Sequence, residues 1–253
     1  MNLTLKITLI LFFTLEVFAR EAGETEITTD DGIEVFQNEK FYLLKKNVRI
    51  ESDTFNLEAN DVKINFDQNL YDITEINAKG NVNFYSDEHN LKGKGEKLKF
   101  EVPLEKLKVE GLKSELFTEN IQMFSDGFIE VDNLKGDFSL NGINSKLINE
   151  NIFIEAKSID GVFLNSVDSM QITFLKVSDE TISYVKNNNT EMYAKKINFD
   201  NDISIIELID NVTIIRNGEK ITGDYGTLDT KNNSYKIKSK KQTKVKAIIQ
   251  DNE

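Results

Sequence analysis

Short stretches in which apolar and polar residues alternate fill almost the whole chain, and this pattern restricts the fold more than any other feature. Residues 211–234 show it most clearly. Residues 212–214 alternate as in a strand with one buried face. Asn217-Gly218 follows, and this pair suits the positive φ angles of a type I′ hairpin turn. A second run at residues 221–228 leads to another turn at residues 231–233, so the unit is strand, turn, strand, turn.

Weaker copies of this unit occur upstream. They begin at Asn47, Asn81, Asn120 and Asn151, so that successive starts, including Asn211, are 34, 39, 31 and 60 residues apart. A period of about 30 to 40 residues is typical of stacked supersecondary units. None of the copies carries a sustained i, i+3, i+4 apolar pattern, so we predict hairpins rather than helix pairs. The sequence therefore predicts an all-β fold in which many antiparallel strands curl around an apolar interior.

Composition excludes several classes of function. The chain has 253 residues and a net charge of −12, from 31 basic and 43 acidic residues. Phosphate binding needs a cationic surface, so we expect no nucleic-acid partner. With no cysteine and one histidine, thiol catalysis, disulfides and the usual zinc sites are excluded. The carboxylates are scattered along alternating strands without an evident acid–base pair, and we expect no enzymatic activity, no catalytic residue, no metal and no cofactor.

The first nineteen residues have the form of a secretory signal. Lys6 precedes an apolar core at residues 7–15, and Val17 and Ala19 occupy the two positions that a signal peptidase reads. A retained membrane anchor is the alternative. Only 13 residues separate Lys6 from Arg20, whereas about 20 apolar residues are needed to span a bilayer. We therefore expect cleavage after Ala19.

Beyond the signal, the sequence predicts a loose acidic segment at residues 21–32 and one β-domain over residues 20–253. This domain is either continuous or made of two stacked halves with a break near residues 120–151. Ser-Asp pairs recur at residues 52–53, 86–87 and 125–126. Because Ser and Asp side chains cap local backbone in turns, we interpret these pairs as turn residues rather than calcium ligands.

The last unit resembles the OstA-like N-terminal domain of the LptA family of lipopolysaccharide transport proteins. The residues that carry the resemblance are Asn211-Val212, Ile221-Thr222-Gly223-Asp224 and residues 225–229. The copies at Asn47 and Asn81 fit the same loose pattern of an Asn-Val strand, a turn and a Leu-x-Ala/Gly strand. The resemblance implies an elongated, open β-jellyroll of consecutive antiparallel strands with an apolar groove. It also implies a periplasmic carrier that holds the acyl chains of the lipid A moiety of lipopolysaccharide inside and leaves the sugars outside.

Edge strands are the partner sites that the resemblance implies. A roll that does not close leaves unpaired backbone groups at its two ends, and these groups accept additional strands. Members of the family join through such edges to inner-membrane export components and to the outer-membrane translocon, and they associate head to tail. An LptC-like, membrane-anchored component of the same pathway is the alternative if residues 1–19 are retained.

Alternation also selects the residues that face the interior, and the resemblance implies that they bind lipid. An inward apolar row is needed by any β-sandwich, so the pattern by itself does not distinguish a filled core from a groove. The family resemblance favours the groove. The predicted lipid-contacting residues are Val48, Ile50, Leu57, Ile64, Phe66, Val82, Phe84, Leu91, Phe100, Ile214 and Ile221.

A structural β-solenoid or adhesin-like exported protein without a ligand is another alternative. Its repeats would be regular, and the uneven spacing of the copies disfavours it. Lysines are concentrated at residues 236–246, in a chain that is otherwise acidic. They fit an edge strand guarded by charge against aggregation, and they also fit contact with the phosphates of a lipid headgroup.

Overall fold

The computed structural model describes residues 23–69, 71–88, 90–165, 170–240 and 244–249. The predicted signal peptide at residues 1–19 lies outside these residues. The described chain is almost entirely β-structure, with a short 3-10 helix, η1 (Val102–Leu104), so the all-β prediction is confirmed. The strands are β1 (Glu26–Thr28), β2 (Ile33–Phe36), β3 (Phe41–Glu51), β4 (Phe55–Phe66), β5 (Ile73–Ser86), β6 (Leu91–Glu101), β7 (Lys106–Glu110), β8 (Ser114–Phe117), β9 (Ile121–Ser125), β10 (Phe128–Asp132), β11 (Asp137–Asn149), β12 (Ile152–Asn165), β13 (Met170–Asn187), β14 (Thr190–Asp200), β15 (Ile205–Arg216), β16 (Glu219–Asp229), β17 (Ser234–Lys238) and β18 (Lys246–Ile248).

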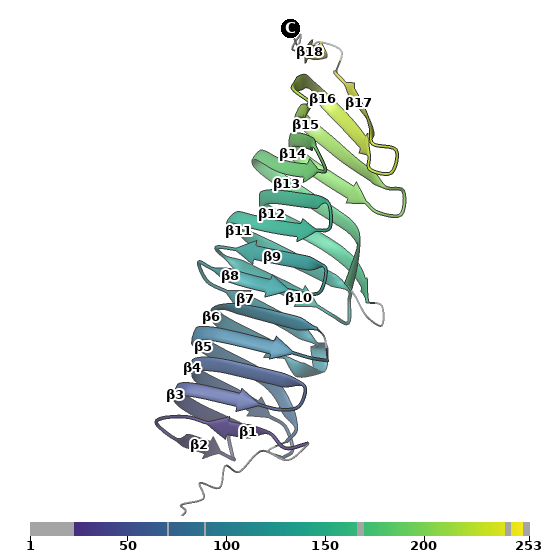
Figure 1. Ribbon diagram of the computed structural model, residues 1–253. Coiled ribbons are helices and arrows are strands. Elements are labelled where there is room, and N and C mark those ends of the chain that lie inside the picture. The colour runs from purple at the N-terminus through teal and green to yellow at the C-terminus, as the bar shows by residue number, and fades with distance from the viewer. Residues whose placement is uncertain (1–22, 70, 89, 166–169, 241–243, 250–253) are drawn as a thin grey trace, which may run out of the picture.

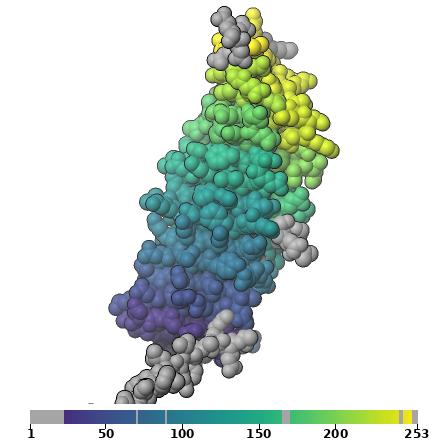
Figure 2. Space-filling model, viewed as in Figure 1, coloured from purple at the N-terminus to yellow at the C-terminus, as the bar shows by residue number. Residues whose placement is uncertain are grey.

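The strands follow one another along a rod, with β1 and β2 at one end and β17 and β18 at the other (Figure 1). They pair antiparallel in an 18-stranded sheet. In the space-filling view the colour changes in sequence order along the rod (Figure 2), so residues close in sequence are also close along its axis. The predicted elongated roll of consecutive antiparallel strands is therefore confirmed.

The sheet is bent along its length into two layers. β3 pairs with β2 through residues 41–44 and with β1 through residues 49–51. At the other end, β16 pairs with β17 through residues 225–229 and with β18 through residues 220–222. Between its two halves, β3 shifts register against β4, and such bulges bend a strand. We call the layer that contains β2, β7, β10 and β17 layer A, and the layer that contains β1, β8, β9 and β18 layer B. The line of register shifts, where the sheet bends from one layer to the other, is the corner. The opposite side, where turns join strands of one layer, is the turn side.

Asparagines with left-handed backbone stand at the corner. Asn47, Asn81 and Asn211 have φ angles of 51°, 50° and 58°, a conformation that Asn tolerates better than most residues. β3, β5 and β15 run through these positions. Three of the five repeat starts therefore mark bends inside strands rather than boundaries between strands. The other two, Asn120 and Asn151, lie in connections on the turn side.

The hairpin predicted at Asn217-Gly218 is confirmed. These residues join β15 to β16 with φ angles of 50° and 82°, both positive as a type I′ turn requires. The predicted turn at residues 231–233 likewise joins β16 to β17. The prediction of a loose segment at residues 21–32 is wrong for Glu26–Thr28, which forms β1 on β3. Three residues are too few for alternation to reveal a strand.

Inward side chains of the two layers form one apolar core along the rod. Leu57, Leu140 and Leu208, from successive regions of the chain, are all 0% exposed. Because the chain has no cysteine, apolar burial and backbone pairing hold the fold together. Gly161 makes room for a ring: a Cβ there would lie 2.1 Å from Cζ of Phe138, its partner across β11 and β12. Glycine at this position therefore lets a phenylalanine fill the core.

Backbone pairing continues through residues 120–151. β9 pairs with both β8 and β11, and β10 pairs with both β7 and β11. Pairing does not by itself define folding units, so the division into two stacked halves stays a prediction. In the part of the chain that the structure describes, no helix is long and apolar enough to cross a membrane.

Candidate functional site: the interior and the two end strands

The residues predicted to contact lipid face the interior in two groups. The larger group lies on β3 to β6, where Ile50, Leu57 and Phe84 stand opposite one another on three successive strands. The smaller group is Ile214 and Ile221, which pair across β15 and β16. The structure thus brings the predicted residues together near each end of the rod. The buried members are Val48, Ile50, Leu57, Ile64, Phe66, Val82, Phe84 and Ile214, and the partly buried ones are Leu91, Phe100 and Ile221.

The interior around these residues is closely packed. Leu57 is 0% exposed, Val48 1% and Phe84 3%. A side chain with no exposed surface borders no space that a water molecule could enter, so these residues contact one another. Contact with an acyl chain stays a prediction, and it requires layers A and B to separate.

Residues in the middle of the rod belong to the same interior but were not among the predicted ones. Leu116 is 2% exposed, and Leu147 and Ile154 are each 0% exposed. The repeat is weak in this region, so a prediction based on the repeat did not include these residues. Alternation in residues 145–156 is the signal that would have found Leu147 and Ile154.

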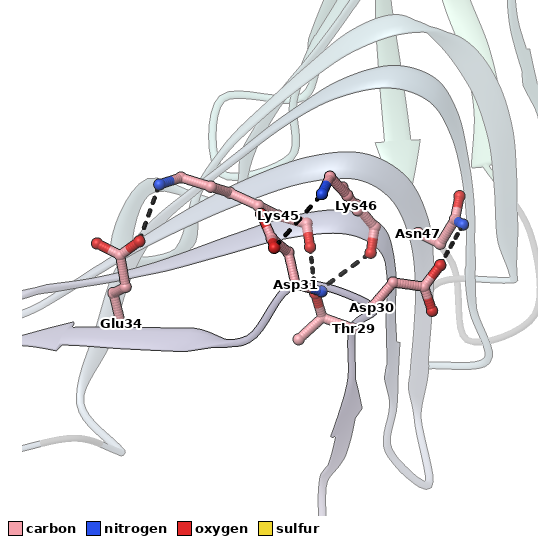
Figure 3. Close-up of polar contacts among 7 residues, drawn as sticks. All are labelled: Thr29, Asp30, Asp31, Glu34, Lys45, Lys46 and Asn47. Carbon is pink, nitrogen blue, oxygen red and sulfur yellow. Dashed lines mark hydrogen bonds and ion pairs between the residues drawn. The ribbon is translucent and has the colours of Figure 1, made fainter.

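The N-terminal end strand is fastened to the corner of β3 by polar contacts (Figure 3). The Thr29 hydroxyl donates to the carbonyl oxygens of Lys45 and Lys46, and Asn47 Nδ2 donates to Asp30 Oδ2 at 2.6 Å. Two ion pairs add to this: Lys46 Nζ lies 3.4 Å from Asp31 Oδ1, and Lys45 Nζ lies 2.8 Å from Glu34 Oε1. These contacts hold β1 and β2 against β3.

The C-terminal end strand is fastened in a similar way with the charges reversed. Lys240 Nζ lies 2.9 Å from Asp210 Oδ1, and the Lys240 backbone N–H donates to Asp224 Oδ2 at 2.7 Å. The hydrogen bond from Lys240, aided by its charge, holds the pKa of Asp210 below its usual value. Asp210-Asn211 has φ angles of 63° and 58°, close to the 62° and 51° of Lys46-Asn47. The same bend therefore holds an end strand at both ends of the rod.

The two end strands carry opposite charge. Residues 23–40 contain six acidic side chains and one lysine, whereas residues 230–249 contain lysines and no acidic residue. Among the described strands, β1 and β2 pair with β3 alone, and β17 and β18 pair with β16 alone. Each end therefore presents a strand edge that no described strand covers, acidic at one end and basic at the other.

Residues 26–137 match the sequence profile of the family described as LptA/(LptD N-terminal domain) LPS transport protein. This part of the chain, 112 of the 253 residues, is similar to that family. The LptA/LptD segment comprises β1 to β10 and the first residue of β11, and it includes the copies at Asn47 and Asn81. Residues 211–229, which carry the clearest resemblance in sequence, lie beyond it. The family prediction is confirmed, but on the N-terminal part of the rod.

Among solved structures, the chain is similar to that of LptH, the LptA homologous periplasmic component of the conserved lipopolysaccharide transport device from Pseudomonas aeruginosa. The sequence identity is 14% and the TM-score is 0.44; the alignment covers 52% of this chain and 95% of the LptH chain. No curated protein matches the chain in sequence.

Proposed function

We propose that this protein carries lipopolysaccharide through the periplasm, with the acyl chains between layers A and B and the sugars outside. The observation that carries the proposal is that residues 26–137, an LptA/LptD segment, share one apolar core with the rest of the rod. An interior whose buried side chains are mostly apolar along the whole rod gives a lipid a continuous path. We propose no catalytic step and no cofactor for this task.

Loading the interior requires the layers to part on the turn side. Side-chain hydrogen bonds there join connections within one layer, as between Asn149 Nδ2 and the Asn120 carbonyl in layer B (3.2 Å) and between Thr230 Oγ1 and the Ser204 carbonyl in layer A (3.1 Å). Between the layers, the inward side chains make apolar contacts. An acyl chain replaces apolar contacts with apolar contacts, so its entry costs less than breaking a hydrogen-bonded layer.

The two ends are the proposed partner sites. Edge strands accept a strand from another protein by backbone pairing, and opposite charge favours contact between the acidic N-terminal edge and the basic C-terminal edge of a second copy. The same edges would pair with the inner-membrane export complex and with the outer-membrane translocon. The protein would thereby form a segment of a bridge between the two membranes.

Photo-crosslinking tests the interior directly. We would replace Phe84, which is 3% exposed, or its neighbour Tyr85, which is 39% exposed, with benzoylphenylalanine and irradiate the full chain in cells that make lipopolysaccharide. Adjacent residues of a strand face opposite sides of the sheet, so the pair differs in the face it samples. We expect a lipopolysaccharide adduct at position 84 and none at position 85. No adduct at either position in folded protein would leave a filled core and favour the ligand-free structural alternative, and equal labelling at both would contradict a preference of the lipid for the interior.

The exported form of the protein separates the two placements within the pathway. An LptA-like carrier loses its signal, so its mass corresponds to a chain that starts at Arg20 after cleavage behind Ala19. An LptC-like component keeps residues 1–19 and stays with the membrane fraction. Intact mass spectrometry of the periplasmic and membrane fractions distinguishes the two.

A further inference from the structure

The connections on the turn side of layer A carry exposed apolar residues at their tips. Tyr71 follows β4 and is 92% exposed, Leu104 lies in η1 and is 51% exposed, Leu134 follows β10 and is 61% exposed, and Ile203 follows β14 and is 64% exposed. Solvent-exposed turns normally consist of polar residues, Gly and Pro. One large apolar side chain in each of four turns on the same edge is therefore a feature to explain. We call these four residues the layer A rim.

The matching edge of layer B has no such feature in the described chain. Its connections lie at residues 52–54, 87–90, 118–120, 150–151 and 188–189, and at Asn217-Gly218. The described residues in them are Ser, Thr, Asp, Glu, Asn and Gly. The connections of layer A are four to six residues long and those of layer B two to four, so layer A has more room for a side chain at the tip of a turn, but length alone does not require that side chain to be apolar. The turn side, where the layers would part and which we call the mouth, therefore has apolar tips along one edge and polar turns along the other.

Two rim residues lie, in sequence, between buried residues of the core. Leu134 lies between Val131, which is 5% exposed, and Phe138, which is 3% exposed. Ile203 stands between Phe199, at 4%, and Ile206, at 0%. Turns on one edge recur every second strand, about 10 Å apart, and four such intervals separate the turn of Tyr71 from that of Ile203, so the rim is roughly 40 Å long. The result is an interrupted apolar line beside the mouth through which the interior would open.

We propose that the layer A rim receives the acyl chains of the lipid as they pass sideways into the space between layers A and B. This inference rests on the proposed function and specifies its loading path: lipid enters along the side of the rod, over one edge of the mouth. The apolar tips would cover acyl carbon during passage, so that the chains are never fully exposed to water. The polar edge of layer B would face the sugars.

The charges beside the tips favour acyl chains over other occupants. Asp72, Glu105, Asp132 and Asp202 lie within two residues of a rim residue, as do Lys106 and Lys135, so these positions carry a net charge of −2. Lys135 pairs with Asp132 at 2.8 Å. The net negative charge disfavours contact with an anionic membrane surface and disfavours two copies joined rim to rim. An acyl chain is uncharged and apolar, so it can lie on the tips without electrostatic repulsion from the carboxylates.

The test compares two triple variants of the full mature chain. L104S/L134S/I203S removes aliphatic side chains from the rim. L112S/I143S/I182S removes three from the corner, where they are 73%, 76% and 54% exposed, so each variant replaces three aliphatic side chains that are more than half exposed. We would measure the loading rate of fluorescently labelled lipopolysaccharide with short sugar chains. The rim variant should load roughly tenfold more slowly, the factor expected from losing about two methylene groups of apolar contact, and the corner variant should load as the wild type does.

Several outcomes would overturn this inference. If Phe84 crosslinks lipopolysaccharide but the rim and corner variants load equally fast, the proposed function stands and the rim has no part in it. If the wild type floats with phosphatidylcholine vesicles and the rim variant does not, the rim is a membrane contact. If the rim variant instead changes the sedimentation coefficient, it is a contact between copies. A wild type that neither crosslinks nor loads would overturn the proposed function together with this inference.

Discussion

The middle of the rod and its ends are built from the same alternating strands but leave their side chains in different surroundings. In the middle, Leu116 and Leu147 are 2% and 0% exposed. At the ends, Ile33 and Val35 of β2 are 47% and 45% exposed, and Ile248 of β18 is 48% exposed. A strand in the middle has a neighbour on each edge, whereas a described end strand has one. The comparison teaches that this fold completes its inward face in the middle, whereas each end leaves the backbone groups of one strand edge unpaired by any described strand.

Shortening a core side chain should have the largest effect, and it should depend on position along the rod. Leu140→Ala, at a site that is 0% exposed, should lower the free energy of unfolding by about 2–5 kcal/mol through lost contacts and a cavity. Ile237→Ala, on the partly buried end strand β17, should cost only about 1 kcal/mol. Denaturant unfolding of the two variants checks this. Equal losses would show that the ends are as tightly packed as the middle.

Reversing charge at one end should weaken association with little effect on the fold. K236E/K246E lowers the charge of residues 230–249 from +7 to +3, and sedimentation velocity at low salt should show head-to-tail association weakened by roughly tenfold. K176E/K186E, on exposed lysines of β13 in the middle, makes the same change in net charge and should leave association unchanged.

E26K/E39K changes the charge of residues 23–40 from −5 to −1 and should weaken association as well, because it removes charge from the acidic edge. An equal loss in K236E/K246E and K176E/K186E would mean that net charge rather than end-to-end complementarity governs association.

Changing the pH should have the smallest effect, and it should be felt at the C-terminal end. The hydrogen bond and charge of Lys240 lower the pKa of Asp210. A carboxylate with a lowered pKa contributes stability above its ordinary pKa of about 4, and this contribution is lost as the pH falls through the folded-state pKa. Asp210→Asn should therefore be less stable than the wild type at pH 6, and the difference should shrink towards pH 3. Thermal melts at both pH values check this; a difference that is constant with pH would contradict the role of the ion pair.

Alternation in the sequence was enough to predict the all-β fold and the inward face of the strands. Val48, Leu57 and Phe84 were placed inside correctly, because neighbouring residues of a strand must face opposite sides. Tight turns were equally accessible, since Asn217-Gly218 has few other conformations as favourable. Strands as short as β1 were missed, because three residues are too few to show an alternating pattern of apolar and polar residues.

The arrangement of the two layers could not be predicted in this way. Asn47 and Asn151 look alike in sequence, since each is followed by an apolar alternating run, yet the first bends a strand at the corner and the second lies in a turn. Which role an asparagine takes depends on the register of the neighbouring strands, and register is a property of pairs of strands rather than of one segment.

The sequence by itself therefore determined which residues are buried and where many turns fall, because a period of two and the demands of turn backbone are local properties. Only the tertiary structure decided that the sheet bends into two layers along a corner at which Asn47, Asn81 and Asn211 adopt left-handed backbone. It alone placed the acidic and basic strands at opposite ends of a rod and the apolar tips on one edge of the mouth. These features depend on which distant segments become neighbours, and that is fixed by strand register and by the packing of the two layers against each other.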